Sequence, residues 1–209
     1  MLDGSRVRLE PVSREAHAAD LYAELHQDPS GRQWTYLPYG PFADADALGA
    51  FPAADPELVT YAIVVADTGR AEGMASYARI SPLIGSIEVG GIIYGPALVR
   101  SAAATEAMYL LAANAFDRLG YRRYEWKCDS LNEASMAAAR RLGFRYEGTW
   151  RNATMYKGRN RDTAWFSITD EEWLVIGPRI AAWLDPANFV GGRQIRSLSA
   201  WQGPNPGLP

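Results

Sequence analysis

Short runs of the chain combine hydrophobic and polar residues in the way that strands do when one face is buried. Arg6–Pro11 alternates charged and apolar residues and predicts a first strand. Leu58–Ala66 is rich in branched and aromatic residues, and turn-forming residues separate it from two further strand-like runs, Ala71–Ile80 and Ser86–Tyr94. We therefore expect these three segments to form a meander of strands.

One longer segment repeats its apolar residues with the period of a helix. Within Ser101–Leu119 the apolar positions recur every three or four residues, which predicts a helix that buries one continuous face. Gly120 follows it, where a left-handed C-cap belongs. The later elements are expected to be a strand at Tyr121–Cys128, a helix at Asn132–Leu142 closed by Gly143, and two strands between Phe144 and Ile168 joined at Lys157–Gly158.

The segment between the first strand and the meander has weaker patterns. Ser13 can cap a helix over Arg14–His26, and Ala43–Phe51 is compatible with a short helix. Between them lies Asp28–Pro41, where proline and glycine break both regular periods. We expect a shaped loop there, whose aromatic residues pack against the protein.

The order of the elements decides the fold class. Strands and helices follow one another in mixed order, so we expect an α+β fold in which helices flank a mixed, mostly antiparallel sheet. The glycine pair Gly90–Gly91 interrupts a strand and predicts a bulge or the close approach of another group. We divide the chain into a main domain, residues 1–176, and a C-terminal part, residues 177–209, with a helix at Pro178–Leu184 and a mobile tail from Gly203.

Composition narrows the class of protein. The chain of 209 residues is 48% hydrophobic and 22% charged, and its formal net charge of -3 gives no argument for binding nucleic acid or an anionic membrane. With one cysteine and two histidines, neither an internal disulfide nor a structural zinc site is expected. No signal peptide or membrane-spanning run is recognisable, so we expect a cytoplasmic location.

A candidate site first becomes visible where the last meander strand runs into the long helix. The start of a helix presents unpaired backbone N–H groups and the positive end of the helix dipole, which suit a phosphate group. The small residues Ser101–Ala104 let a ligand approach that backbone, and Arg100 adds a positive charge. The alternative is that small residues only allow the helix to pack near a strand.

Several short motifs recur in the order and spacing of a known family. They are Ala104-Thr105-Glu106-Ala107, the turn LGYRR from Leu119 to Arg123, Asn132-Glu133-Ala134-Ser135, and LGFRYEG from Leu142 to Gly148. With these motifs the chain from Arg6 to Trp173 resembles the GNAT acetyltransferases, in the branch named for the RimJ and RimL ribosomal-protein enzymes. Trp34–Phe42 and Lys157–Asp162 resemble a subgroup of that branch.

The resemblance implies a V-shaped splay of the sheet that holds acetyl-coenzyme A, with no metal. The family's pyrophosphate loop, Gln/Arg-x-x-Gly-x-Gly/Ala, falls on Val99, Ala102 and Ala104. Valine and alanine here replace a polar residue and a glycine, and alanine would weaken a cradle that needs unusual backbone torsions. The residues expected at the cofactor are Val89, Gly91, Ile92, Val99, Arg100, Ser101, Ala102, Ala103, Ala104, Thr105, Asn132, Ser135 and Arg140.

The resemblance also implies two catalytic residues. An amine must lose a proton before it attacks a thioester, and Glu88 is the candidate base, directly or through water. Most strand glutamates are instead solvent-facing carboxylates. Ser135 is expected to help the thiolate leave, and Asn132 to contact the cofactor. Packing is the alternative for Ser135, and helix capping is a second role for Asn132. Backbone N–H groups of Val89–Ile92 are expected to polarise the thioester carbonyl.

Aromatic residues are the candidates for binding the acceptor. Trp34, Tyr36 and Tyr39 could line its pocket and Tyr94 could stand near the thioester, although each such residue more often belongs to a core. A cysteine at a strand end, Cys128, is more often a small buried residue than an acyl carrier.

The expected function is therefore acetyl transfer from acetyl-coenzyme A to a primary amine, a protein N-terminus or a small molecule, by direct attack. A homodimer is compatible with the fold. The alternative is a GNAT-fold protein of little or no activity that binds or senses coenzyme A or interacts with other proteins. Arg159 and Arg161 are expected to form a charged hairpin turn or an interface.

Overall fold

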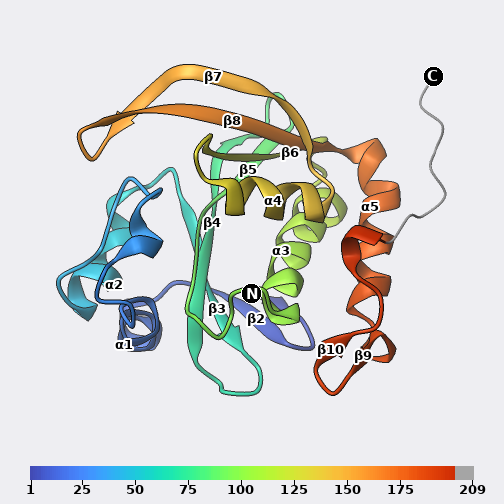
Figure 1. Cartoon of the computed structure of the whole chain (residues 1–209), viewed down its shortest axis with the longest axis horizontal. Helices are drawn as coiled ribbons and strands as arrows, with labels where there is room; N and C mark the ends of the chain where they lie inside the picture. The colour runs from blue at the N-terminus through green and yellow to red at the C-terminus, as the bar shows by residue number, and fades with distance from the viewer. Residues whose placement is uncertain (201–209) are drawn as a thin grey trace.

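The computed structural model describes residues 1–200, apart from the side chains of residues 52–54. Its main sheet has eight strands in the order β1-β2-β3-β4-β5-β6-β8-β7 (Figure 1), and within it only β5 and β6 are parallel neighbours. The fold is thus α+β with a mixed, mostly antiparallel sheet, as predicted. The tail from Gly203 lies outside the described residues.

The elements follow one another along the chain as listed here from the N-terminus. They are β1 (Leu2–Asp3), β2 (Val7–Pro11), α1 (Arg14–Leu25), α2 (Ala45–Ala54), β3 (Val59–Val65), β4 (Ala71–Ser81), β5 (Ser86–Tyr94), α3 (Ala102–Ala113), β6 (Arg123–Asp129), α4 (Glu133–Leu142), β7 (Arg145–Tyr156), β8 (Arg159–Thr169), α5 (Asp170–Leu184), β9 (Phe189–Val190) and β10 (Arg193–Gln194). A π-helical turn, Asn114–Arg118, extends α3, and short 3-10 helices occupy Arg32–Trp34, Pro186–Asn188 and Leu198–Ala200. No described helix is long and apolar enough to cross a membrane.

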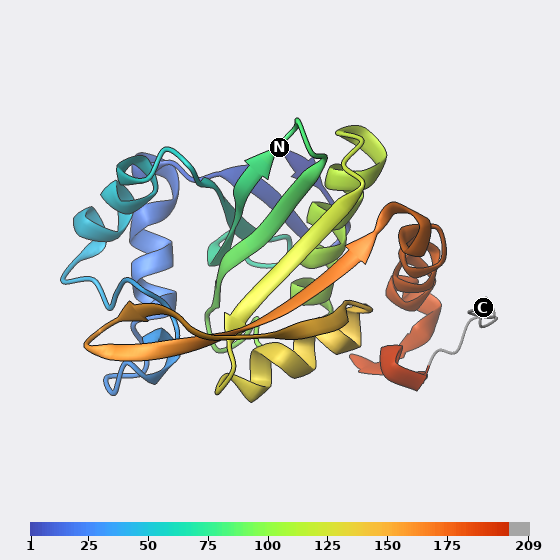
Figure 2. The ribbon, with the colours of Figure 1, turned by 90° about the horizontal axis from the view of Figure 1, so that it is seen from above.

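Helices cover both faces of the sheet, and each face has its own core (Figures 1 and 2). On the face that we call the α1 face, Leu21 of α1 and Leu48 of α2 pack with Trp34. On the opposite face, the α3 face, α3, α4 and α5 enclose a larger core that contains Leu111 and Phe166. Alternate residues of each central strand therefore point to two different environments.

The main difference from the predicted elements is α5. The sequence predicts a helix that begins at Pro178, but the helix begins at Asp170 and Pro178 lies inside it. Thr169 and Glu172 form a capping box there, which satisfies two backbone donors of the first turn and outweighs the helix-breaking tendency of the proline. The proposed boundary at residue 176 falls inside α5, and the division of the chain stays a prediction.

Two irregularities open the sheet at β5. Pairing between β5 and β6 begins at Ser86 and ends at Val89, opposite Trp126, although both strands continue along their other neighbours. On the β4 side the register shifts around Gly90–Ile92, and Gly91 has a φ of 59°. This confirms the bulge predicted at the glycine pair, and the splay between the two strands begins directly after Val89. We call this point the vertex.

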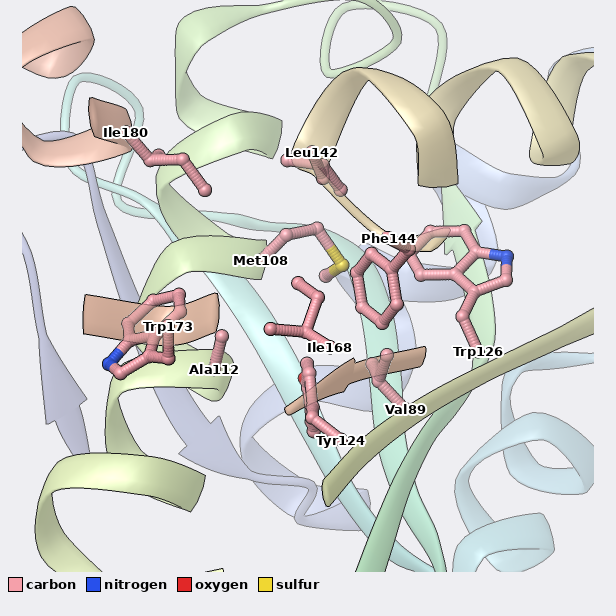
Figure 3. Close-up of a pocket in the computed structure, with 10 residues that line it drawn as sticks. All are labelled: Val89, Met108, Ala112, Tyr124, Trp126, Leu142, Phe144, Ile168, Trp173 and Ile180. Carbon is pink, nitrogen blue, oxygen red and sulfur yellow. The ribbon is translucent and has the colours of Figure 1, made fainter. Parts of the chain in front are cut away.

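A small cavity lies beside the vertex on the α3 face (Figure 3). It has room for about one water molecule, about 10 Å³. Its lining is almost entirely apolar and consists of Val89, Met108, Ala112, Tyr124, Trp126, Leu142, Phe144, Ile168, Trp173 and Ile180. The cavity is therefore part of the packed core beneath the splay.

Candidate active site

The start of α3 lies at the end of the turn that follows β5, and Ser101 caps it. The Ser101 hydroxyl donates to Leu98 O at 2.7 Å and accepts from Ala104 N at 2.9 Å. The N–H groups of Ala102 and Ala103 then remain without an acceptor among the described residues. Together with the helix dipole they form a place for an anionic group.

The backbone strain of this turn lies at Arg100 and not at the alanines for which it is predicted. Ala102 and Ala104 belong to the helix and have no left-handed torsions, so alanine does not strain the backbone at either position. Arg100 instead has a φ of 59°, a conformation that side chains with a Cβ rarely adopt. The predicted weakening of the loop by alanine therefore has no basis in the backbone.

Replacing Arg100 with glycine is expected to raise the free energy of unfolding by about 0.5–1 kcal/mol. Left-handed torsions cost an ordinary residue about 1–2 kcal/mol, which the greater freedom of glycine in the unfolded chain partly offsets. Urea denaturation measures the change. Val99→Gly is the control, because Val99 is equally exposed but has no left-handed torsion, and it should lose stability. An Arg100→Gly protein less stable than wild type would contradict this account.

The last turn of α4 brings an arginine to the start of α3. Arg141 Nη1 donates to Thr105 Oγ1 at 3.1 Å, and its guanidinium lies over the Trp183 ring. Arg179 of α5 donates to the carbonyl of Arg141, and burial together with the Arg179 charge lowers the pKa of Arg141. Neither arginine has a carboxylate partner among the described residues, so the pair favours an anion between α3, α4 and α5.

The sequence predicts that the neighbouring residue, Arg140, contacts the cofactor. Arg140 is exposed and its guanidinium carbon lies 5.5 Å from the centre of the Phe166 ring, on the other side of α4. No spacing within the short helix distinguishes two adjacent arginines. Only the packing of α4 against α3 shows that Arg141 is the one beside the first turn of α3.

Ser135 and Asn132 lie at the start of α4, next to the vertex. Asn132 Oδ1 accepts from the Ser135 backbone N–H at 3.1 Å, so the predicted capping role is confirmed. The Ser135 hydroxyl accepts from Trp126 Nε1 at 3.0 Å, and Trp126 is the residue paired with Val89 at the vertex. This bond uses a lone pair of the Ser135 oxygen and not its hydrogen, which can point to the neighbouring Cys128 sulfur or toward the α3 face.

Cys128 follows on the same side of β6 as Trp126. Its side chain is buried, and burial raises the pKa of the thiol in spite of a hydrogen bond to Ser135. The thiol therefore stays protonated, which agrees with the interpretation of Cys128 as a small buried residue.

Glu88 lies at the vertex on the opposite face. Its neighbours Ile87 and Val89 belong to the core of the α3 face, so Glu88 points to the α1 face. The residue is only 9% exposed and forms ion pairs with Lys127, the first β6 residue beyond the paired segment, and with Arg79 at 3.6 Å. A solvent-facing carboxylate, the alternative for Glu88, is therefore excluded.

Burial dominates the electrostatics of this pair. It raises the pKa of the Glu88 carboxyl, while the charges of Lys127 and Arg79 act in the opposite direction. Burial also lowers the pKa of the Lys127 ammonium, whose nitrogen lies 4.2 Å from the centre of the Trp165 ring. Lys127 and Trp165 were not among the predicted site residues.

The aromatic residues predicted for the acceptor separate into different places. Trp34 is 1% exposed and packs against His26 and Phe42, so it supports the loop from within the core. Tyr39 reaches the bulge, because a Cβ on Gly91 would lie 2.9 Å from the Tyr39 hydroxyl oxygen.

Tyr36 and Tyr94 end on different sides of the sheet. The Tyr36 hydroxyl donates to Leu131 O at 3.0 Å, which links the loop to the end of β6. Tyr94 packs against the core of the α3 face, so it lies across the sheet from Tyr39. The structure brings Tyr36 and Tyr39, but not Tyr94, to the α1 face.

The β7–β8 hairpin holds the aromatic loop in place. Lys157 Nζ donates to Trp34 O at 2.7 Å and to Tyr39 O at 3.2 Å. Arg159 donates to Thr35 O at 3.4 Å and to the carboxylate of Asp129 at 3.1 Å. Both views show the hairpin reaching over the α1 side (Figures 1 and 2). Arg159, predicted as part of a turn or an interface, thus joins two distant parts of the same chain.

Comparisons with known proteins identify the family of the chain. A sequence model of the acetyltransferase (GNAT) domain matches residues 6–145. The chain belongs to the GNAT acetyltransferase family. No match was found among curated proteins. Among the described residues, no group of three or more His, Cys, Asp or Glu side chains could hold a metal ion.

Solved GNAT structures share the fold. A GCN5-related N-acetyltransferase from Brucella melitensis is 39% identical over 94% of this chain and 91% of that chain, with a TM-score of 0.91. A GNAT-family protein from Chromobacterium violaceum is 44% identical over 82% of this chain and 87% of that chain, with a TM-score of 0.76. A spermidine N-acetyltransferase from Vibrio cholerae, solved with coenzyme A and spermine, is 17% identical over 82% of this chain and 99% of that chain, with a TM-score of 0.66, and shows the fold alone.

Proposed function

We propose that this GNAT protein transfers the acetyl group of acetyl-coenzyme A to a primary amine by direct attack. One observation carries the proposal: at the vertex of the splay, Glu88 stands on the α1 face and Ser135 on the α3 face. A buried carboxylate and a hydroxyl donor on opposite sides of one opening suit a reaction in which the acceptor enters from one face and the thiol leaves on the other.

The α3 face fits an acyl-coenzyme A. The free N–H groups of Ala102 and Ala103 would hold its pyrophosphate, with Arg141 and Arg179 adding positive charge beside them. The left-handed Gly91 has no side chain of its own, and the Tyr39 hydroxyl occupies the space beside it on the α1 face. When bound, acetyl-coenzyme A supplies an activated acetyl group. The solved complex of the Vibrio cholerae relative with coenzyme A agrees with this assignment of the donor.

Glu88 would act as the base on the acceptor side. Its carboxylate, held by Lys127 and Arg79, would take the proton of the incoming ammonium group directly or through water. Backbone N–H groups of Gly90–Ile92, which have no partner in β6, would donate to the carbonyl oxygen as negative charge develops on it. Ser135 would donate its hydrogen toward the departing sulfur.

Several finer points belong to the proposal. The motif order favours the RimJ/RimL-like branch of the family, and Tyr36 and Tyr39 remain the aromatic residues proposed to contact the acceptor. The acceptor is a protein N-terminus or a small-molecule amine, as spermidine is for the Vibrio cholerae enzyme. The homodimer and the cytoplasmic location stay predictions.

Titration calorimetry with coenzyme A and acetyl-coenzyme A, followed by assays of thiol release with amines, tests the function. We expect one site per chain and a weakening of about tenfold in Arg141→Gln, since a charge-assisted hydrogen bond contributes about 1.5–3 kcal/mol. Arg140→Gln is the matched control and should bind nearly as wild type. Absence of binding by the wild-type protein would reject the enzyme and favour a protein-interaction role.

A further inference from the structure

Two buried N–H donors on β8 have no hydrogen-bond acceptor among the described residues. They are Arg161 Nε and Trp165 Nε1. Both residues point to the α1 face, because the intervening Ala164 and the next residue, Phe166, belong to the core of the α3 face. A buried donor without an acceptor costs free energy, and neither of these two donors finds an acceptor among the residues that the structure describes.

Arg161 also lacks a counter-charge. Its guanidinium is half-buried, lies 5.8 Å from the centre of the Tyr156 ring, and forms no ion pair with a described residue. Asp129, which lies opposite Thr163 on the neighbouring strand, already accepts from Arg159 and from the Tyr156 hydroxyl at 2.7 Å. A partly desolvated guanidinium that forms no ion pair gains free energy when it binds an anion.

The other charged groups near the splay on the α1 face also favour an anion. Glu88 is already paired with Lys127 and Arg79, and Asp129 with Arg159, so the carboxylates beside the vertex and at the end of β6 are both engaged. Further from the opening, Glu125 is paired with Arg123. Arg161 forms no ion pair with any of these carboxylates, and among the groups named here the positive charges outnumber the negative charges.

We propose that Arg161 forms an anion subsite on the acceptor side, and that the amine acceptor of this protein carries a carboxylate or similar anionic group. The inference rests on the proposed function, in which the acceptor approaches along the α1 face. A carboxylate can accept from the guanidinium and neutralise its charge. A polyamine brings only further positive charge to this surface.

The register of the strands sets the length of the acceptor. Lys127 at the vertex pairs with Trp165, and Arg161 lies four residues further along β8. At about 3.3 Å per residue this is about 13 Å, which the reach of the Arg161 side chain shortens. The anionic group is therefore separated from the reacting amine by several bonds, as in an ω-amino acid or a short peptide.

Thiol release with matched acceptors tests the subsite. We would use ω-amino acids with one to six methylene groups, their primary amides, and spermidine. In wild type the longer amino acids should react at least tenfold more efficiently, in kcat/KM, than their amides, and spermidine should be poorest. Arg161→Gln should abolish the preference and leave the amide rates unchanged. Arg151→Gln, an exposed arginine on the same hairpin, is the charge-matched control and should keep the preference.

Equal rates for acids and amides in wild type, or an unchanged preference in Arg161→Gln, would overturn the subsite while leaving the acetyltransferase intact. A second measurement does not depend on turnover. Thermal unfolding in glutarate against glutaramide, at constant ionic strength, should show stabilisation by glutarate in wild type and Arg151→Gln and its loss in Arg161→Gln. Equal stabilisation of all three proteins, or none in wild type, would refute the subsite even if no amine in the series reacts.

Discussion

Replacing Glu88 with glutamine is expected to lower kcat for amine acetylation at least 100-fold. General base catalysis contributes about 100- to 10,000-fold, and glutamine keeps the shape of the side chain but cannot accept the proton. Steady-state thiol release measures the loss, and circular dichroism checks the fold. Glu125→Gln is the matched control, because Glu125 lies opposite Glu88 on the neighbouring strand and should change kcat little.

The pH dependence gives this prediction a second readout. Burial raises the pKa of Glu88 above the ordinary 4.5, in spite of Lys127 and Arg79, so protonation disables the base at a higher pH than for an exposed glutamate. Activity should therefore fall as pH decreases through that raised pKa, and this acid limb should be absent from Glu88→Gln. A variant with wild-type kcat and an unchanged pH profile would remove Glu88 from the mechanism.

Replacing Trp34 with alanine is expected to lower the free energy of unfolding by about 3–5 kcal/mol. The side chain is 1% exposed and its ring contacts those of His26, Tyr39 and Phe42, so truncation leaves a large cavity in the core of the α1 face. Chemical denaturation followed by circular dichroism measures the change.

Trp34→Phe separates packing from substrate binding. Phenylalanine keeps most of the apolar volume, so this variant should lose less stability than alanine and keep a near-normal KM for the amine. If Trp34 touched the acceptor directly, Trp34→Phe would raise KM while the protein stayed stable. That result would show that Trp34 belongs to the acceptor site, although its side chain is buried.

The sequence predicts the central elements well because their patterns are locally complete. The strands from Val59 to Tyr94 and the helix from Ala102 repeat their own periods, and the glycine pair marks the bulge. It predicts α5 poorly, since the proline at 178 resembles a start and the stronger capping box at Thr169 lies nine residues earlier in a strand-like context. β1, β9 and β10 have two residues each and are too short to show a period.

The candidate site is predicted only where one residue and its own element suffice. Glu88 follows from the family resemblance together with its strand, and Ser101 from its place at the start of the long helix. Lys127, Arg141 and Lys157 escape prediction because each acts through an element remote in the chain, and the bond from Lys157 to Trp34 spans 123 residues. No local pattern in a single sequence encodes such partners.

The attachment of the aromatic loop has a consequence for the evolution of this scaffold. The side chains of Lys157 and Arg159 donate hydrogen bonds to the backbone carbonyl oxygens of the loop. These oxygens belong to Trp34, Thr35 and Tyr39, and the loop side chains take no part in these bonds. Every amino acid has that oxygen, so a substitution between residues 35 and 39 leaves these backbone bonds in place even where it removes a side-chain contact such as the bond from Tyr36 to Leu131. The side chains that face an acceptor can thus change during evolution while the backbone of the loop keeps its attachment to the β7–β8 hairpin.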